Sequence, residues 1–143
     1  MNISSPADIV FVENGRVDVE QLNALYQTIG WNSNGQRTLE KTTEMLQVSH
    51  YYIAAYATDS LLVGFARVCG DPYIVQVLDV ITHPAYRRRG IATRCMQEVI
   101  NHLQRSQYIS VTLTDGSGIT DFYQRFGFRV IHGDAVARVW RRG

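Results

Sequence analysis

Residues 78–105 are the stretch that most limits what this chain can fold into. Residues 78–81 form an apolar run interrupted only by Asp79, which is typical of a strand buried on both faces. Pro84 cannot donate a hydrogen bond to a strand ladder, so we expect the strand to end just before it. Beyond the loop, apolar residues recur at the spacing of a helix: Ile91, Cys95, Met96, Val99 and Leu103. The stretch therefore predicts a buried strand, an arginine-rich loop and a helix.

The loop between this strand and this helix has the properties of an anion site. A helix N-terminus leaves its first backbone N–H groups unpaired and carries a partial positive charge. Gly90 lacks a side chain, so a ligand can approach the backbone closely there. Arg87, Arg88 and Arg89 add charge-assisted hydrogen-bond donors. A phosphate or pyrophosphate group would fit this loop.

The same residues resemble a known family signature. Arg87-x-x-Gly90-x-Ala92, placed between a strand and a helix, is similar to the acyl-CoA motif Q/R-x-x-G-x-G/A of the Gcn5-related N-acetyltransferase (GNAT) family. Residues 122–128 resemble a second family element, F-Y-x-x-x-G-F. Taken alone, three arginines could simply form a solvated turn. The strand and helix context, together with the second element, favours the family.

Length and composition set the remaining limits on the fold. We expect one domain over residues 1–143, which is large enough for a hydrophobic core. The formal charge of +1 argues against broad electrostatic binding to nucleic acid or membrane. Two cysteines are too few for a disulfide framework, so we expect a reducing, cytoplasmic environment.

The order of predicted elements indicates an α/β fold with a mixed, mostly antiparallel sheet flanked by helices. It matches the acyl-CoA N-acyltransferase fold that the GNAT resemblance implies. Helices are expected after Asp18, which forms a capping-box pattern with Gln21, after Thr38, from Ile91, and over residues 119–126. Strands are expected over residues 9–12, 51–57, 61–69, 73–82, 108–113, 128–131 and 135–140, the last two joined by a turn at residues 132–134.

The resemblance also implies how the chain would hold its acyl donor, acetyl-CoA. Backbone N–H groups of residues 88–93 would receive the pyrophosphate, and the pantetheine arm would pair with the central strand like an added strand. The backbone of residues 78–80 would polarise the thioester carbonyl. No metal is expected. The residues implied in binding acetyl-CoA are Val80, Ile81, Thr82, Arg87, Arg88, Arg89, Gly90, Ile91, Ala92, Thr93 and Tyr123.

Asp79 is the unusual residue of the central strand, because a buried carboxylate is unfavourable unless it is paired. One interpretation is a structural ion pair with an arginine such as Arg67. The other is a catalytic general base that accepts a proton from the incoming amine. Histone-type members of the family carry a glutamate base at the position of Gln76, so this chain departs from their pattern.

Tyr123 is the second catalytic candidate. In the family element that residues 122–128 resemble, the tyrosine hydroxyl lies near the CoA sulfur as a general acid. Alternatively, Tyr123 is only part of the core, because Ile119, Phe122 and Phe126 surround it at helical spacing. Three further aromatic residues could line an acceptor pocket or could simply be packed: Trp31, Tyr51 and Tyr52.

The function predicted from the sequence is acetyl transfer from acetyl-CoA to a primary amine of a small molecule, by direct attack in a ternary complex. Within the family the motifs resemble serotonin N-acetyltransferases and, equally, small bacterial members, so an arylalkylamine is one candidate acceptor. Two alternatives stay open: a protein or peptide acetyltransferase, and a non-catalytic acyl-CoA sensor or interaction module. Gly116-Ser117-Gly118 is a poor match to a dinucleotide motif. We expect no nucleic-acid or membrane partner, and homodimer formation is left open.

Overall fold

The computed structural model describes residues 8–115, 120–131, 138, 140 and 141. Within these residues, five strands form one sheet in the order β1-β2-β3-β4-β5. Neighbouring strands run antiparallel except β4 and β5, which are parallel. The mixed, mostly antiparallel sheet is therefore confirmed. The strands are β1 (Ile9–Glu13), β2 (Tyr51–Ala57), β3 (Leu62–Gly70), β4 (Ile74–Thr82) and β5 (Ser110–Thr112).

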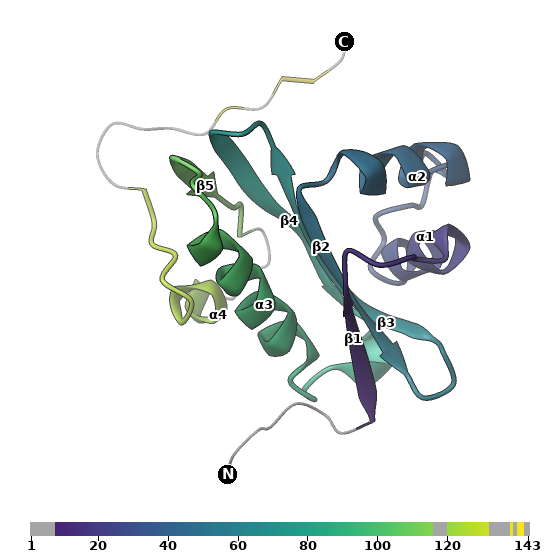
Figure 1. The fold of residues 1–143 in the computed structure, drawn as a ribbon. Coiled ribbons are helices and arrows are strands. Elements are labelled where there is room, and N and C mark those ends of the chain that lie inside the picture. Colours follow the sequence, from purple (N-terminus) through teal and green to yellow (C-terminus); the bar gives the residue numbers. More distant parts are fainter. Residues whose placement is uncertain (1–7, 116–119, 132–137, 139, 142–143) are drawn as a thin grey trace.

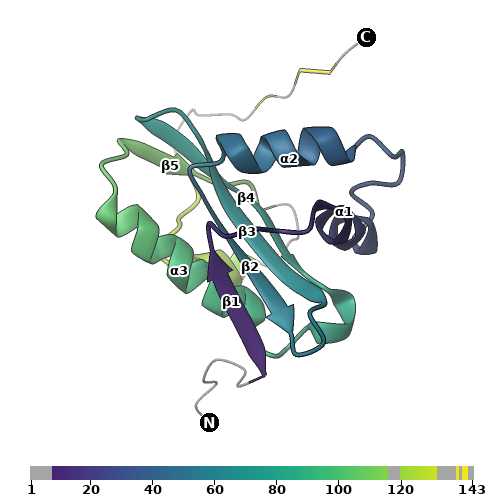
Figure 2. The same cartoon turned by 45° about the vertical axis from the view of Figure 1, so that its right-hand side comes forward.

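Helices cover both faces of the sheet (Figures 1 and 2). Helices α1 (Val19–Thr28) and α2 (Leu39–Val48) lie on one face. Helices α3 (Ile91–Arg105) and α4 (Thr120–Gln124) lie on the other. A short 3-10 helix, η1 (Pro84–Tyr86), follows β4 and leads into the loop before α3.

The alternation of side chains along the strands divides the core into two parts. On β2, the side chains of Tyr51, Ile53 and Ala55 join the cluster under α3, whereas Ala54 joins the cluster under α1. Successive strand residues point to opposite faces, so one strand can supply both clusters. The apolar face of α3, with Cys95, Met96 and Val99, is buried as its spacing predicted.

The capping box expected at the start of α1 is only half formed. The Asp18 carboxylate accepts hydrogen bonds from the backbone N–H groups of Glu20 and Gln21, as expected of an N-cap. The Gln21 side chain does not reach back to Asp18. Its amide instead donates to the Ser60 carbonyl and accepts from the Leu62 N–H, so it fastens α1 to the β2–β3 turn.

The prediction of a strand over residues 128–131 is wrong. No strand is formed there, and the side chains of Val130 and Ile131 are 76% and 68% exposed. A strand depends on ladder bonds to a neighbour, and within the described residues no strand pairs with this segment. Its expected partner, residues 135–140, and the turn at 132–134 lie outside the described residues, apart from positions 138 and 140. The same holds for residues 116–119.

We predict that Gly64 of β3 is needed for the close approach of α3 to the sheet. A Cβ atom on Gly64 would lie 2.5 Å from Cγ2 of Ile91 and 3.2 Å from Cβ of Ala55. Gly64→Ala should therefore lower the free energy of unfolding by about 1–3 kcal/mol through overpacking. Urea denaturation measures this change.

The matched control for Gly64→Ala is the double variant Gly64→Ala/Ile91→Ala, which removes the clashing methyl group. Its loss of stability should be smaller than the sum of the two single losses, because contacting residues do not act additively. A Gly64→Ala protein as stable as the unmodified chain would contradict the close packing of Ile91 on β3.

Candidate active site

The sheet opens between β4 and β5. These strands pair only at the start of β4, where Ile74, Val75 and Gln76 face residues 110–112. On its other side β4 stays paired with β3 as far as Thr82, which faces Gly64. From Val77 to Thr82, the edge of β4 that faces away from β3 therefore has no strand partner in the described chain. Its backbone groups are available to a ligand that binds as an extended strand.

A bulge interrupts β4 within this open segment. The register passes from Arg67 opposite Leu78 to Phe65 opposite Ile81, so Asp79 and Val80 together face one residue of β3. Asp79 has φ of +56°, in the left-handed region that few non-glycine residues adopt. Bulges bend a strand and redirect its side chains, and they occur often beside active sites.

A pocket of about 1080 Å³ opens along the unpaired edge of β4. Its other walls are the first turn of α3, the chain after β5, helix α4 and the loop between α1 and α2. The structure brings eleven of the predicted site residues to this pocket: Asp79, Val80, Ile81, Thr82, Arg87, Arg88, Gly90, Ile91, Ala92, Thr93 and Tyr123. Arg89 does not line it. The Arg89 guanidinium lies over the ring of Tyr86, 4.9 Å from its centre.

The arginine loop presents the N-terminus of α3 to the pocket. Gly90 is the N-cap residue, with φ of +78° and no side-chain capping bond. The first helical hydrogen bond runs from the Arg94 N–H to the Gly90 carbonyl. The N–H groups of residues 91–93 therefore point out of the helix. Together with the exposed side chains of Arg87 and Arg88, they form a positively polarised end to the pocket.

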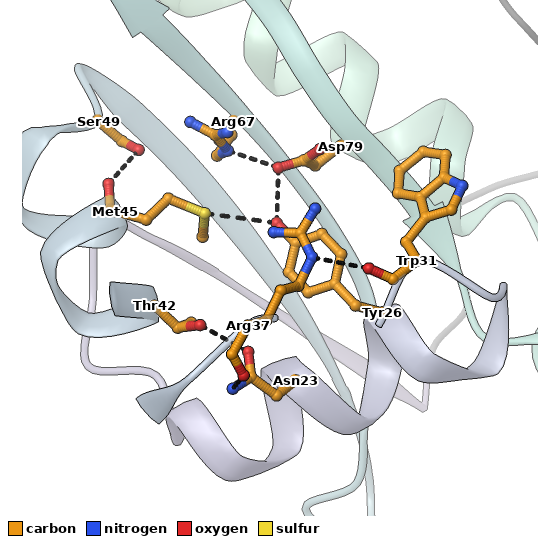
Figure 3. A network of polar contacts seen from close by, with 9 residues as sticks. All are labelled: Asn23, Tyr26, Trp31, Arg37, Thr42, Met45, Ser49, Arg67 and Asp79. Atoms are coloured by element: carbon orange, nitrogen blue, oxygen red, sulfur yellow. Dashed lines mark hydrogen bonds and ion pairs between the residues drawn. The ribbon is translucent and has the colours of Figure 1, made fainter. Parts of the chain in front are cut away.

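The ion pair expected between Asp79 and Arg67 is confirmed, and a tyrosine joins it (Figure 3). Oδ2 of Asp79 accepts a hydrogen bond from Nε of Arg67 at 2.6 Å and another from the Tyr26 hydroxyl at 2.6 Å. Within the described residues, Oδ1 of Asp79 accepts none. The carboxylate is therefore held from the side of α1 and β3 while its residue lines the pocket.

Burial of Tyr26 and the charge of Asp79 together keep both donors protonated. Burial raises the pKa of Tyr26, and the adjacent Asp79 carboxylate raises it further. Burial alone would lower the pKa of Arg67, but attraction to Asp79 and the hydrogen bond between them more than offset this, so the net shift is upward. Tyr26 and Arg67 therefore both remain donors to Asp79 at neutral pH. Whether Asp79 also acts as a base stays a prediction.

Tyr123 is packed against the hydrophobic core and also lines the pocket. Its ring packs against Phe122 and Phe128, with centres 5.0 and 6.4 Å away, and belongs to the cluster under α3. It also lines the pocket. Burial, and secondarily the charge of Asp115, raises the pKa of its hydroxyl, so Tyr123 stays protonated at neutral pH. Its role as an acid remains a prediction.

Of the three aromatic residues considered for an acceptor pocket, one lines the pocket and two do not. Trp31 lines the pocket and is 51% exposed. Tyr51 is buried and donates to Glu13, and Tyr52 donates to the Gly15 carbonyl. Neither of these tyrosines lines the pocket, so packing explains them.

Sequence reasoning missed several residues around the pocket. Asp115 was not identified, although it lies just beyond the end of β5, where β4 continues without a partner, and that position was a usable signal. Tyr26 and Arg37 were also missed. The spacing of α1 assigned Tyr26 only to an apolar stripe. No local pattern connects Tyr26 to Asp79, or Arg37 to the Tyr26 ring.

The described residues contain neither a metal-binding cluster nor a membrane-spanning helix. Within residues 8–115 and 120–131, no set of three histidine, cysteine or acidic side chains is placed to bind a metal ion. In the same ranges, no helix combines the length and apolar character needed to span a bilayer.

Comparison with known proteins identifies the fold around this pocket. A family model described as the acetyltransferase (GNAT) domain matches residues 47–130, more than half of the chain. A solved GNAT family acetyltransferase from Streptococcus pneumoniae superposes with a TM-score of 0.75 at 28% identity, covering 94% of this chain and 98% of that one. A Staphylococcus aureus structure has a TM-score of 0.78 at 18% identity, covering 94% and 99%, and supports the fold alone.

Curated relatives point the same way. The uncharacterized N-acetyltransferase ycf52 of Pyropia yezoensis is 27% identical over 125 residues, which are 85% of this chain and 70% of that protein. The histone acetyltransferase TAP1 of Glycine max is 27% identical over 131 residues, which are 84% of this chain and 55% of that protein. The chain thus spans little more than half the length of the second relative. By its sequence match and its structure, this chain belongs to the GNAT family of N-acetyltransferases.

Proposed function

We propose that the chain transfers an acetyl group from acetyl-CoA to a primary amine of a small molecule, by direct attack in a ternary complex. One observation carries the proposal: the unpaired edge of β4 runs through a single pocket that contains the arginine loop, Asp79 and Tyr123. A donor bound along that edge would have its phosphates at one end and its reacting carbonyl beside both catalytic candidates.

The pocket suits CoA in charge and in backbone geometry. The pyrophosphate binds the N–H groups of residues 91–93, with Arg87 and Arg88 as charged partners. The pantetheine arm pairs with the free backbone edge of Val80 to Thr82, which no strand occupies in the described chain. Arg89 contributes through its charge rather than by lining the pocket, since it stacks on Tyr86.

The chemistry then requires three groups. The amine nitrogen attacks the thioester carbonyl carbon, while backbone N–H groups near the β4 bulge stabilise the charge developing on the carbonyl oxygen. Asp79 accepts the proton that the nitrogen loses. The C–S bond breaks, and the departing thiolate takes the proton of the Tyr123 hydroxyl.

The acceptor side of the pocket supports a small amine with an apolar body. Ile29, Trp31 and Leu78 line this side, and Asp79 is a carboxylate beside them. Aromatic and aliphatic walls with one charged group are typical of sites for small organic molecules. The exposed indole of Trp31 is a suitable partner for an aromatic ring, so arylalkylamines are the first acceptors to test.

A protein or peptide acceptor is the second candidate, because one relative is named a histone acetyltransferase. Gln76 supports the small-molecule proposal against it. It occupies the position of the glutamate base of histone-type members, and in this chain it pairs with Thr112 in the closed part of the sheet and does not line the pocket.

Turnover with a panel of amines tests the proposal directly. Free thiol should be released from acetyl-CoA in the presence of an arylalkylamine, without added metal. A polyamine and a histone-tail peptide serve as the competing acceptor classes. Release with the peptide alone would favour the second candidate. CoA binding by calorimetry, with no release for any amine, would support a non-catalytic acyl-CoA sensor and contradict the enzyme.

We predict that Gly90→Val weakens acetyl-CoA binding by at least about tenfold, since Gly90 adopts φ of +78° and the phosphate must approach its backbone. Calorimetry measures the dissociation constant. Gly35→Val is the matched control, because Gly35 also has positive φ, +64°, but belongs to the α1–α2 loop and does not line the pocket. Equal affinity in both variants would place the phosphates elsewhere.

We predict that Tyr123→Phe lowers turnover by roughly two to four powers of ten, the usual effect of removing a general acid. The ring and its packing on Phe122 and Phe128 are retained, so the melting temperature and acetyl-CoA affinity should change little. Steady-state kinetics at saturating amine measures the loss. A thioester with a more acidic thiol should be affected less, because its thiolate leaves more readily. Full activity in Tyr123→Phe would show that this tyrosine serves only the core.

A further inference from the structure

We propose that Tyr26 is a positioning residue that fixes the Asp79 carboxylate for the acceptor amine, and that Arg37 ties the Trp31 loop to the same ring. This inference rests on the proposed function, because it assigns the acceptor side of that site. It concerns residues of α1 and of the loop after it, which the catalytic steps above do not use.

The contact between Tyr26 and Asp79 orients the carboxylate. Tyr26 is fully buried in α1, and its hydroxyl lies 2.6 Å from Oδ2 of Asp79. Arg67 approaches the same oxygen from β3. One donor would leave the carboxylate free to turn about that bond, whereas two donors from different elements fix its plane. Oδ1 accepts no bond within the described residues, so it is the oxygen left for the amine.

The position of Asp79 makes this support necessary. Asp79 lies in the β4 bulge with φ of +56°, a conformation that is unfavourable for a residue with a side chain. Such a residue persists only where its surroundings hold it, and the pair of donors does so here. The Tyr26 hydroxyl has one other acceptor within reach, the uncharged sulfur of Met45 at 3.6 Å. Among the described residues, Asp79 is therefore its only charged acceptor.

Arg37 connects the loop that carries Trp31 to the Tyr26 ring (Figure 3). Its guanidinium lies 3.6 Å from the centre of the Tyr26 ring, in a cation–π contact. Its Nε donates to the Trp31 carbonyl at 3.1 Å, and its backbone N–H donates to the Asn32 side chain at 2.9 Å. The Asn23 amide donates to the Arg37 carbonyl at 2.8 Å. Arg37 therefore closes the loop that carries Trp31 and holds it against α1.

One ring thus fixes both parts of the acceptor side. The hydroxyl of Tyr26 orients the Asp79 carboxylate. The face of its ring holds Arg37, which in turn holds the loop that carries Trp31. The loss of either contact should affect the amine and spare the donor, because the groups assigned to the donor are not members of this network: they are the backbone edge of Val80 to Thr82 and the arginine loop. A tyrosine that served only the core would tolerate replacement by phenylalanine without this selectivity.

The test is a kinetic comparison of Tyr26→Phe with Tyr52→Phe, using the best acceptor of the amine panel. Tyr52 is a matched control, since it packs against the same cluster and its hydroxyl also donates a partly buried hydrogen bond, to the Gly15 carbonyl and not to Asp79. Tyr26→Phe should lower kcat/KM for the amine by at least about tenfold, the effect of losing a hydrogen bond to a charged group. The KM for acetyl-CoA should stay within about twofold of the unmodified chain in both variants.

A double-mutant cycle with Asp79→Asn separates positioning from simple destabilisation. If Tyr26 acts through Asp79, adding Tyr26→Phe to Asp79→Asn should produce no further loss in kcat/KM for the amine. Thermal unfolding, followed in parallel, confines the assay to folded protein. Arg37→Gln tests the loop: the KM for the amine should rise while kcat is unchanged, because the carboxylate keeps both donors.

Each contrary outcome has a distinct meaning. Tyr26→Phe kinetics equal to those of Tyr52→Phe, or losses that multiply in the double variant, would overturn the role of Tyr26. An unchanged amine KM in Arg37→Gln would overturn the role of Arg37. If the unmodified chain acetylates no amine, the proposed function fails and this inference fails with it. If the unmodified chain is active and the variants at Tyr26 and Arg37 behave like it, the proposed function stands and only this inference is overturned.

Discussion

The site depends on the unequal pairing of β4. One edge of this strand pairs with β3 from Val75 to Thr82, interrupted only by the bulge, whereas β5 pairs with only the first three residues of the other edge. A strand edge in the middle of a sheet is normally closed, because unpaired backbone groups away from water are unfavourable. Here they are exposed to a pocket, so a ligand that completes the ladder gains hydrogen bonds without breaking any in the protein.

The bulge at Asp79 and Val80 is a second consequence of this arrangement. A regular strand would keep alternating its side chains between the two faces. With two residues opposite one residue of β3, β4 bends and the Asp79 carboxylate reaches Arg67 and Tyr26 at 2.6 Å each. Both side chains of the ion pair are little exposed, at 13% and 12%, so removing either partner would leave an uncompensated charge in a poorly hydrated place. The same groups therefore support the fold and shape the site.

How much the sequence predicts depends on how local the determining contacts are. The strand, loop and helix over residues 78–105 follow from proline, glycine and apolar spacing within one stretch, and the structure has them there. The Arg67–Asp79 pair was accessible too, because a carboxylate in an apolar strand requires a partner. The strand expected at 128–131 is not formed, because a strand also needs ladder bonds to a neighbour, and within the described residues no strand pairs with this segment. Tyr26 was assigned to a buried stripe correctly, but its hydroxyl contact spans 53 residues of sequence.

The donor and acceptor sides of the pocket come from different parts of the chain. Under the proposed function, residues 80–93 and 123 form the donor side, and they fall inside the range matched by the acetyltransferase family model, as do Leu78 and Asp79 of the acceptor side. Tyr26, Trp31 and Arg37 precede that range, and they reach the site only because α1 packs on β3 and β4. Under this proposal, binding of the donor relies on backbone geometry that a short motif can specify. The proposed acceptor side relies on side chains brought together by the fold. Under the same proposal, α1 and its following loop could change their side chains, and with them the acceptor, while the β4 edge and the arginine loop stay as they are.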